Sequence, residues 1–579
     1  MKFLSALVSM MFLVLAGCGG GSSSGSTDAI TPEVVSEIND AIVRISQAST
    51  DNKVVVSYGL TDGNQVFEFS DGSSALVVDN GLISSVSENT SLWRLVINFS
   101  NATSANLNLQ PSSIGVSNSN ITLNPSGYAP LSAEASFEAP FPGQIRVAVP
   151  GKGVGGIRLE HTFVREGTAY QIPIHGLYQD YVNPVEIQFL DVSGNILCVD
   201  EVAVETEALT DAPIVNIVSN NLPATEDKLY MEVGLKHAFD QAGEFRWAYS
   251  GGDVFQIFER LPNGNWLVTG NADKVLYHWP YFHEMDMFGN LVETYSVPNL
   301  GHHEVVRMVN GNYLVAGNSV AFTQSVFLDD EVSQEDTVQE VSAETGEVIA
   351  EYDFNELLDP AREILVEFLP GDWLHINAVY EDAEDNSIVV SGRHQAAIVK
   401  VSRSDGGLEW ILSPHEQWPE SLQSYLLTPV DSAGSPLDVS DINFWPYGQH
   451  AISKLPNGNV LLYDNGNDRG LYKGPVLSEN LYSRAVEYQV DAVSMTVQKV
   501  WEYDYMRSFY STSMSDVDYL ADTGGRLISF MGSDGGSVLA MPRVVELDGQ
   551  NNIVFEYVIN QGESDLYRTA KFDLYENVQ

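Results

Sequence analysis

Residues 450–463 read HAISKLPNGNVLLY, and this stretch decides the fold because it combines a strand, a tight turn and a second strand. Asn-Gly between two apolar runs is a strong short-range signal of a β-hairpin. The same turn recurs at residues 262–265 (PNGN) and 310–312 (NGN), and other polar turns hold corresponding places at 385–386 and 522–525. The chain therefore contains a repeated hairpin.

Each hairpin alternates with a second strand pair whose last strand ends in an aromatic residue. Six copies of this half-unit end at Trp247, Tyr295, Tyr352, Trp410, Trp501 and Tyr557. Four strands per unit, repeated six times, are typical of a six-bladed β-propeller, which we expect over residues 225–579. The longer gap before Trp501 predicts an inserted loop within residues 413–447.

Two further segments precede the repeat. Residues 115–212 contain short alternating strands separated by Gly, Asn, Ser and Pro, which is typical of an Ig-like β-sandwich. Residues 31–114 form an N-terminal extension, in which apolar positions at helical spacing predict a helix over 32–47 followed by a small β module. The expected fold class is all-β, a six-bladed β-propeller preceded by an Ig-like sandwich, with a short N-terminal helix.

The first 18 residues have the features of an export signal. A lysine is followed by an apolar run too short to span a membrane, and the run ends in Leu-Ala-Gly-Cys. This ending resembles the bacterial lipobox, which implies lipid attachment at Cys18. Residues 19–30, mostly Gly and Ser, then form a flexible tether. Gly at position 19 favours the outer membrane, so we expect a lipoprotein on its periplasmic side or at the cell surface.

The composition excludes several classes of partner. With 78 acidic and 28 basic residues, the formal charge of −50 argues against binding to nucleic acids or anionic membrane surfaces. An anionic substrate would be repelled unless its pocket carried local cations. Only Cys198 remains beyond the lipobox, so neither an internal disulfide nor a cysteine metal site is expected.

Three histidines occupy matched places at the start of the repeated hairpin. His303 and His450 precede the first turn Asn by the same seven residues, and His375 precedes Asp385-Asn386 by a slightly longer strand. If the units repeat in space, the three imidazoles converge at the propeller axis. Gln256 holds the corresponding place in another unit, and Arg393, after the strand that follows His375, is a cationic companion.

Histidine suits nucleophilic or acid–base work because its usual pKa lies near 6.5. A zinc site is the direct competitor, since zinc accepts three imidazoles and a water. The metal site is the weaker interpretation because no carboxylate accompanies the histidines in the repeat and Arg393 disfavours a cation. We therefore expect no metal and no cofactor.

Several of these residues carry a resemblance to a known family. Residues 374–377 (LHIN), 389–395 (VVSGRHQ) and 448–451 (GQHA) closely resemble the bacterial aryl-sulfate sulfotransferases. Residues 128–131 (YAPL) and 175–178 (HGLY) resemble that family's N-terminal Ig-like domain. The resemblance covers about residues 115–575.

The resemblance implies a propeller enzyme that moves a sulfuryl group from a phenolic sulfate ester to a phenolic acceptor without a nucleotide donor. It implies that His450 is the nucleophile, transiently sulfated, and that His375 and Arg393 support it. The remaining site histidine falls on His303 or its neighbour His302, and the seven-residue offset shared with His450 selects His303.

Further substrate contacts are expected from residues beside these positions: Asn377, His302 and His394. The expected partners are a phenolic sulfate donor and a phenol acceptor, with the membrane contacted only through the lipid anchor. The oligomeric state stays open, a homodimer included. Two alternatives also remain open. One is an aryl-sulfate hydrolase that uses water as acceptor, and the other is a non-catalytic, membrane-tethered propeller that binds a ligand through its face.

Overall fold

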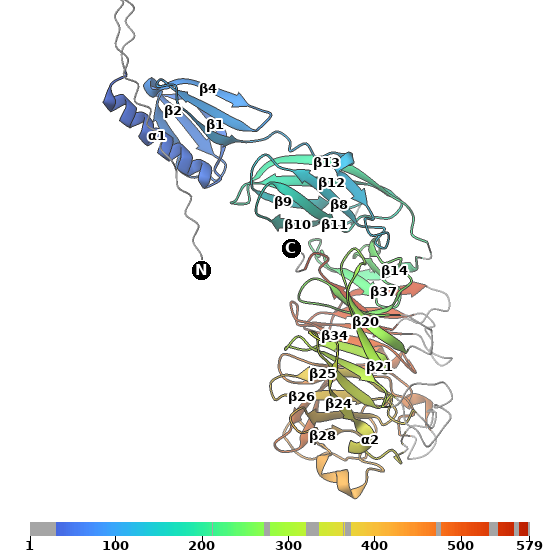
Figure 1. Cartoon of the computed structure of the whole chain (residues 1–579). Coiled ribbons are helices and arrows are strands. Elements are labelled where there is room, and N and C mark those ends of the chain that lie inside the picture. The colour runs from blue at the N-terminus through green and yellow to red at the C-terminus, as the bar shows by residue number, and fades with distance from the viewer. Residues whose placement is uncertain are drawn as a thin grey trace, which may run out of the picture. The chain divides into compact units, whose positions relative to one another are not determined.

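The protein is described from a computed structural model (Figure 1). The described residues are 30–153, 155–210, 212–270, 278–319, 335–362, 364, 372–470, 476–531, 542–560 and 567–576. Cys18 and the proposed signal and tether lie outside them, apart from residue 30. No helix among the described residues is both long enough and apolar enough to cross a membrane. The chain divides into two compact units, Met1–Gln110 and Pro111–Gln579.

The first unit packs one helix on one sheet. Helix α1 (Pro32–Thr50) begins after Thr31, whose hydroxyl accepts a hydrogen bond from the Val34 N–H, and it runs three residues beyond the predicted end. Its buried face contacts a six-stranded sheet in the order β3-β2-β1-β6-β5-β4. The strands are β1 (Val54–Thr61), β2 (Asn64–Phe69), β3 (Leu76–Asp79), β4 (Ile83–Asn89), β5 (Arg94–Phe99) and β6 (Ser104–Leu109).

The second unit begins with an Ig-like domain of two antiparallel sheets. One sheet has the order β10-β9-β12-β13 and the other the order β11-β8-β7. Their strands are β7 (Ile121–Leu123), β8 (Ala133–Glu138), β9 (Gln144–Val149), β10 (Leu159–Val164), β11 (Ala169–Ile174), β12 (Tyr181–Leu190) and β13 (Ile196–Thr206). Cys198 on β13 is buried with a free thiol, as its apolar sequence context predicts.

The rest of the second unit consists of sheets arranged one after another (Figure 1). A four-stranded sheet, β17-β16-β15-β38, contains β15 (Leu229–Glu232), β16 (His237–Phe239), β17 (Phe245–Ala248) and β38 (Thr569–Phe572). A seven-stranded sheet runs in chain order through β18 (Val254–Arg260), β19 (Trp266–Gly270), β20 (Trp279–Met285), β21 (Leu291–Arg307), β22 (Tyr313–Gly317), β23 (Thr337–Val341) and β24 (Val348–Asp353), and the short helix α2 (Phe354–Leu357) follows it.

Three further sheet regions complete the unit. One sheet contains β25 (Ile376–Asp382), β26 (Ser387–Gly392), β27 (Ala397–Ser402) and β28 (Leu408–Leu412) in that order. The next has the order β29-β33-β32-β31-β30 and contains β29 (Thr428–Pro429), β30 (His450–Lys454), β31 (Val460–Asp464), β32 (Arg484–Asp491) and β33 (Thr496–Tyr503). The last, β14-β37-β36-β35-β34, contains β14 (Ile214–Asn220), β34 (Asp516–Leu520), β35 (Gly525–Phe530), β36 (Arg543–Leu547) and β37 (Ile553–Asn560).

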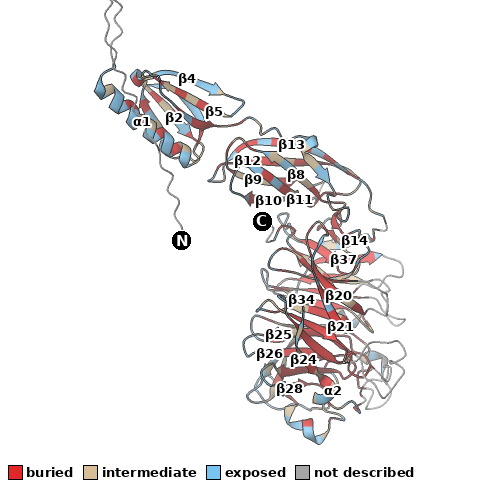
Figure 2. Cartoon of the chain, in the orientation of Figure 1, coloured by how far each residue is buried: buried red, intermediate tan, exposed pale blue. Residues whose placement is uncertain are grey.

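The second strand of several hairpins is buried along its whole length. Every residue of β19, β22, β26 and β31 is buried, and Figure 2 shows the same concentration of buried positions in this part of the chain. A strand covered on both faces reads as a continuous apolar run rather than an alternating one. This explains why VVSG and VLLY stand out in the sequence.

The repeated turn has a structural role that its sequence pattern did not predict. The turn glycines Gly264, Gly311 and Gly458 have φ angles of +84°, +90° and +85°, a conformation that favours glycine. The two asparagines of each turn donate side-chain hydrogen bonds to one glutamate of the following strand. These glutamates are Glu284, Glu340 and Glu487.

Each of these glutamates also binds an arginine, and two of those arginines lie in the neighbouring sheet. Glu340 on β23 pairs with Arg403 at 2.7 Å, just after β27, and Glu487 on β32 pairs with Arg526 on β35. The Asn-Gly-Asn turn therefore orients a carboxylate that links one sheet to the next.

The predicted insertion between Trp410 and Trp501 is present. Residues 413–449 contain a 3-10 helix (Glu420–Tyr425) and the two-residue strand β29, and no other regular element. β29 pairs in parallel with β33, so the insertion adds an edge strand to its own sheet.

Candidate active site

The three matched histidines lie where the first two strands of their hairpins pair irregularly. The pairing register shifts between Gly301 and Val305, between Ile376 and Ala378, and between His450 and Ser453. Positive φ angles accompany the shifts, +48° at His303, +55° at His375 and +53° at Ala451. β-Bulges re-aim side chains next to active sites, and a non-glycine residue at positive φ costs free energy that the surrounding fold must offset.

Two of the three histidines are in ring contact, together with neighbours. The ring centroids of His303 and His375 lie 4.5 Å apart, and those of His375 and His394 also lie 4.5 Å apart. His302 lies 5.2 Å from His303 and 5.6 Å from His278. The cluster thus contains both members of the His302-His303 pair, and His278 from the start of the β20 region, which the sequence did not single out.

Two buried carboxylates lie inside the cluster, although no carboxylate accompanies the histidines in the hairpin repeat itself. Glu335 approaches His375 Nδ1 at 2.8 Å and His278 Nε2 at 3.3 Å. Asp372 approaches the same His375 nitrogen at 2.8 Å. Both acids come from connecting segments ahead of β23 and β25, outside the hairpin repeat. Burial and the nearby Glu335 carboxylate hold the pKa of Asp372 well above its usual value.

His450, at the start of β30, has its tautomer fixed by one amide. The Asn465 side chain donates from Nδ2 to the Ser511 carbonyl at 2.9 Å and to the Met514 carbonyl at 3.1 Å. Its Oδ1 must therefore face His450 Nδ1, 2.8 Å away, and accept a hydrogen bond from it. The lone pair of His450 then resides on Nε2, which accepts a long hydrogen bond of 3.3 Å from the Met514 backbone N–H.

Burial keeps the site imidazoles neutral. The pKa of His450 lies well below 6.5 because burial disfavours the charged ring and Arg393 adds positive charge nearby. The same causes lower the pKa of His375. Burial, followed by the charge of His375, lowers the pKa of His303 and of His394, and burial lowers the pKa of His302 to about 4. Neutral imidazoles have lone pairs for nucleophilic attack or for a metal ion.

Arg393 lies in the turn after β26 and packs against the His375 segment. Its backbone N–H donates to the His375 carbonyl at 3.1 Å. Its guanidinium donates to the Thr512 carbonyl at 3.0 Å and to His394 Nε2 at 2.6 Å. His394 Nδ1 donates to the Asp372 carbonyl at 2.6 Å, so both nitrogens of this ring are engaged.

Asn377 on β25 links two sheets beside the nucleophile candidate. Its Nδ2 donates to the Gln449 carbonyl at 2.8 Å, the residue immediately before His450. Its Oδ1 is buried without a hydrogen-bond donor. Arg568 reaches the Asn377 carbonyl from the other side and forms a two-point ion pair with the buried Glu304.

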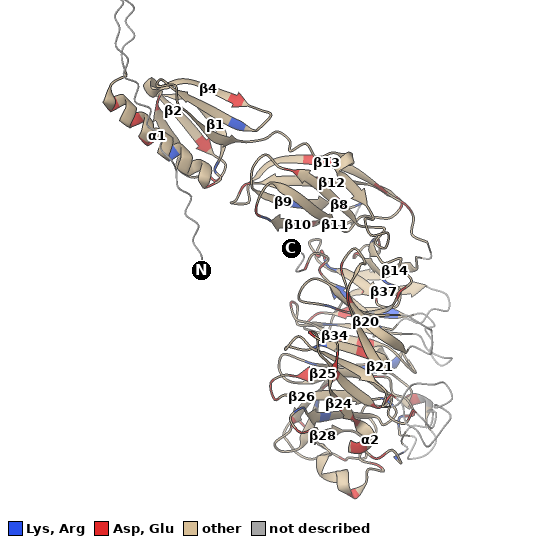
Figure 3. Cartoon of the chain, viewed as in Figure 1, with Lys and Arg blue, Asp and Glu red and all other residues tan. Residues whose placement is uncertain are grey.

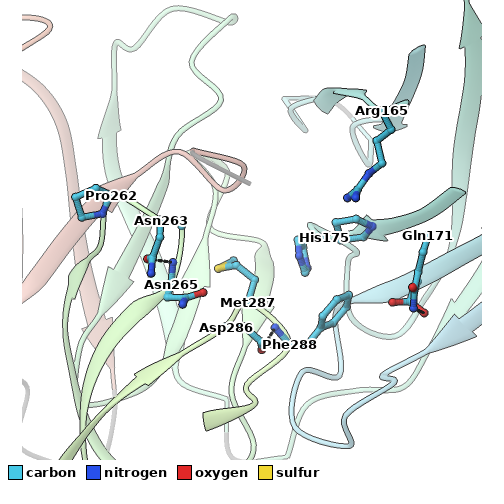
Figure 4. A pocket seen from close by; sticks show the side chains of 12 residues that line it. Arg165, Gln171, His175, Pro262, Asn263, Asn265, Asp286, Met287 and Phe288 are labelled. Atoms are coloured by element: carbon cyan, nitrogen blue, oxygen red, sulfur yellow. Dashed lines mark hydrogen bonds between the residues drawn. The ribbon is translucent and has the colours of Figure 1, made fainter. Parts of the chain in front are cut away.

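A separate pocket of about 680 Å³ lies between the Ig-like domain and the β18–β20 region (Figure 4). Arg165 and His175 line it on one side and Asn263 and Met287 on the other. Burial lowers the pKa of His175 to about 3. None of the residues lining this pocket belongs to the histidine cluster, so we place the chemistry at the cluster.

The site supplies the local cations that a strongly acidic chain needs for an anionic substrate. Acidic positions outnumber basic ones and are scattered over the ribbon in Figure 3. Against this background, Arg393 and five neutral imidazoles with N–H donors are gathered around the first hairpin strands. The fold and the site define an all-β enzyme with a histidine- and arginine-based centre suited to an anionic group.

The comparisons with known proteins give the family. Residues 215–568, more than half of the chain, match the family model described as Arylsulfotransferase (ASST), and residues 120–207 match that of the Arylsulfotransferase Ig-like domain. The chain therefore belongs to the arylsulfotransferase family, which confirms the resemblance stated from the sequence, and it is a sulfotransferase.

Two curated relatives are both named arylsulfate sulfotransferase AssT. The protein from Escherichia coli O6:H1 is 28% identical over 514 residues, covering 69% of this chain and 83% of the relative. The protein from Lelliottia amnigena is 27% identical over 522 residues, covering 71% and 84%. Among solved structures, hydrazine synthase from Kuenenia stuttgartiensis aligns with a TM-score of 0.28 at 11% identity, over 51% of this chain and 63% of that chain.

Proposed function

We propose that this protein transfers a sulfuryl group from a phenolic sulfate ester to a phenolic acceptor through a sulfated His450, in two successive half-reactions. The observation that carries the proposal is the fixed tautomer of His450. Because Asn465 Oδ1 accepts a hydrogen bond from His450 Nδ1–H, the lone pair is on Nε2, and a sulfur atom that approaches it displaces the long hydrogen bond from the Met514 N–H. Burial and Arg393 keep the ring neutral, so the lone pair is present at neutral pH.

In the first half-reaction, the Nε2 lone pair forms an N–S bond while the bond from sulfur to the aryl oxygen breaks. The phenolate leaves with the electron pair of that bond, and one of the neighbouring histidines supplies its proton. In the second half-reaction, the acceptor phenol loses its proton to a basic group, its oxygen attacks sulfur, and the N–S bond breaks. Splitting one transfer into two lowers each barrier.

One cation and several neutral hydrogen-bond donors around His450 support this chemistry. Arg393 and the N–H groups of His303 and His375 are suited to the sulfuryl oxygens, on which negative charge grows during transfer. A preorganised donor of this kind contributes about 3 to 4 kcal/mol to transition-state stabilisation. His302, His394 and Asn377 complete the set, with Asn377 holding the Gln449 carbonyl beside the nucleophile.

We also propose that the sheets after residue 213 form a six-bladed β-propeller. The seven-stranded sheet divides into two four-stranded blades if β21 is shared, since this 17-residue strand pairs with β20 through its first part and with β22 through its last. Strands from the two ends of this region pair with each other, β14 with β37 and β15 with β38, as ring closure requires.

We propose further that the mature chain is a lipoprotein attached through Cys18 and held on the periplasmic side of the outer membrane or at the cell surface. The support is the LAGC ending of an apolar export signal and the Gly/Ser-rich segment after it. Incorporation of labelled palmitate, and its loss in Cys18→Ala, would test this attachment.

A turnover assay with a chromogenic aryl sulfate tests the transfer. We expect phenol release by the wild type that depends on an added acceptor phenol, and no release by His450→Asn. His161→Asn, in the Ig-like domain, is the matched control and should retain wild-type turnover. Release without any acceptor would indicate a hydrolase, and turnover by His450→Asn would refute the proposed nucleophile.

A further inference from the structure

The histidine cluster gathers more ligand-type atoms around one buried carboxylate than a sulfuryl site requires. Glu335 Oε2 is 2.8 Å from His375 Nδ1 and 3.8 Å from His303 Nδ1. His303 Nδ1 is in turn 3.0 Å from His302 Nδ1. The donor atoms of His302, His303 and Glu335 all lie within 4.8 Å of one another.

The Glu335 carboxylate lies in surroundings that are unfavourable for an uncompensated negative charge. Its side chain is fully buried, and neither of its carboxylate oxygens receives a hydrogen bond of acceptable geometry. Its backbone has a φ of +58°, an unfavourable conformation for a side chain of this size. A buried carboxylate without donors is costly, so a group that compensates it is expected.

The single proton on His375 Nδ1 cannot make a well-aligned hydrogen bond to both neighbouring carboxyl groups. His375 Nδ1 lies 2.8 Å from Glu335 and also 2.8 Å from Asp372, and one N–H donates a single well-aligned bond. Two carboxylates at hydrogen-bond distance from one imidazole nitrogen are the arrangement expected when all three atoms surround a cation.

The separations fit a zinc-class ion. Bonds of about 2.0 to 2.1 Å in a tetrahedral zinc site place neighbouring ligand atoms about 3.3 Å apart. Within the group of His302, His303 and Glu335, the separations of 3.0 and 3.8 Å lie on either side of that value, and His375 Nδ1 lies 2.8 Å from Glu335 Oε2. All four donors are imidazole nitrogens or carboxylate oxygens, the usual zinc ligands outside cysteine sites.

The hydrogen bonds that each ring makes outside the cluster show which histidines have a nitrogen lone pair for a metal ion. His302 Nε2 donates to the Gly317 carbonyl at 2.9 Å, which leaves the Nδ1 lone pair facing the cluster. His394 differs, because the Asp372 carbonyl and Arg393 engage both of its nitrogens. The Arg393 guanidinium contacts His394 and Thr512.

We propose that His302, His303 and Glu335 bind one divalent transition-metal cation of the zinc class, with His375, 2.8 Å from the Glu335 carboxylate, as the nearest further donor. The role of this cation rests on the proposed function. The Glu335 carboxylate would otherwise oppose an aryl sulfate anion, and a divalent cation offsets its charge. Metal bound at Nδ1 of His303 leaves an N–H at Nε2 of this ring, which keeps it as a donor to the sulfuryl oxygens.

Metal analysis of the full-length protein, purified without chelators, tests the site directly. We expect about one zinc per chain, and after removal of zinc we expect one equivalent of Co²⁺ to bind with the intense visible absorption of a low-coordinate site. Glu335→Gln should weaken Co²⁺ binding at least 100-fold. The matched control is Glu384→Gln, which changes an exposed acid paired with Lys454 and should bind Co²⁺ as the wild type does.

A second variant keeps the test decisive if Glu335→Gln misfolds. His302→Gln removes one ligand and is expected to bind Co²⁺ more weakly, with a shifted absorption spectrum and a melting temperature that zinc no longer raises. Absence of stoichiometric zinc and Co²⁺ binding, or equal binding by wild type and folded ligand variants, would overturn the site. If the wild type turns over aryl sulfate but binds no metal, only this inference fails. If it binds metal stoichiometrically but transfers no sulfuryl group, only the proposed function fails.

Discussion

Replacing Asn465 by aspartate tests how the fold prepares His450. The exchange keeps the size of the side chain but puts a carboxylate at the Nδ1 nitrogen, 2.8 Å from the present amide oxygen. An opposite charge this close favours the imidazolium, so the pKa of His450 should rise from its present position well below 6.5. Protonation removes the Nε2 lone pair on which attack depends.

The size of the effect follows from the geometry. Centres of charge about 4 Å apart interact by about 4 kcal/mol at an effective dielectric constant near 20, which corresponds to about three pKa units. The neutral, reactive ring is then lost as the pH falls through the raised pKa and recovered as the pH rises. As the pH is lowered, we expect the kcat of Asn465→Asp to fall at a higher pH than the kcat of the wild type, because the variant loses the neutral ring through its raised pKa.

Initial rates with a chromogenic aryl sulfate and a fixed acceptor phenol, taken from pH 5.5 to 9, measure the effect. The matched control is Asn98→Asp, a partly exposed position in the first unit whose side chain bonds Ser85, and its profile should follow that of the wild type. A profile of Asn465→Asp that superimposes on the wild-type profile would refute the assigned tautomer and its electrostatic consequence.

Three further predictions concern the rest of the molecule. Arg393→Lys cannot keep both hydrogen bonds of the guanidinium, to His394 and to Thr512. Steady-state kinetics should therefore show kcat/KM reduced by about 100-fold, with an unchanged circular dichroism spectrum. Near-normal turnover would exclude a role for the guanidinium group in the reaction. Glu487→Gln leaves Arg526 without its counter-charge, so urea unfolding should show a loss of about 3 kcal/mol, and an unchanged midpoint would contradict the link between sheets. Burial raises the pKa of Glu232 from about 4.5 to about 8, so the free energy of unfolding of the wild type falls as the pH rises through this window. Glu232→Gln should therefore become the more stable of the two proteins by pH 8. Parallel curves of unfolding free energy against pH would contradict the raised pKa.

Much of the hairpin architecture follows from local sequence. Asn-Gly turns between apolar runs identified the β19, β22 and β31 hairpins, because positive φ at glycine and continuous burial of the second strand leave a clear pattern. The all-β class and the Ig-like domain were confirmed. The pairing of β21 with two neighbours was not predicted, since it depends on a 17-residue strand bending between them.

The repeat predicted the three matched histidines, and the family resemblance and neighbouring positions added Arg393, Asn377, His302 and His394. Matched bulges hold His303, His375 and His450, so their similar spacing from the hairpin turns could be recognised in the sequence. Glu335 and Asp372 come from connections whose lengths differ between units, and no local pattern predicts that a connection turns inward. His278 likewise stands outside the matched position.

Asn465 could have been found from sequence. It follows His450 by the same fifteen residues that separate Asn318 from His303, because both asparagines come just after the second strand of their hairpins. Asn318 in turn bonds the backbone of Asn299, Leu300 and Glu335, so this position stabilises the site segments in both units.

Rapid-quench mass spectrometry of the peptide containing His450 tests the central claim most directly. The protein is mixed with an aryl sulfate in the absence of acceptor, quenched at alkaline pH and digested. The mechanism predicts one added sulfuryl group on His450, which disappears when a phenol is added before the quench as the sulfated phenol forms. A peptide that stays unmodified throughout, while phenol is released at the wild-type rate, would contradict the mechanism.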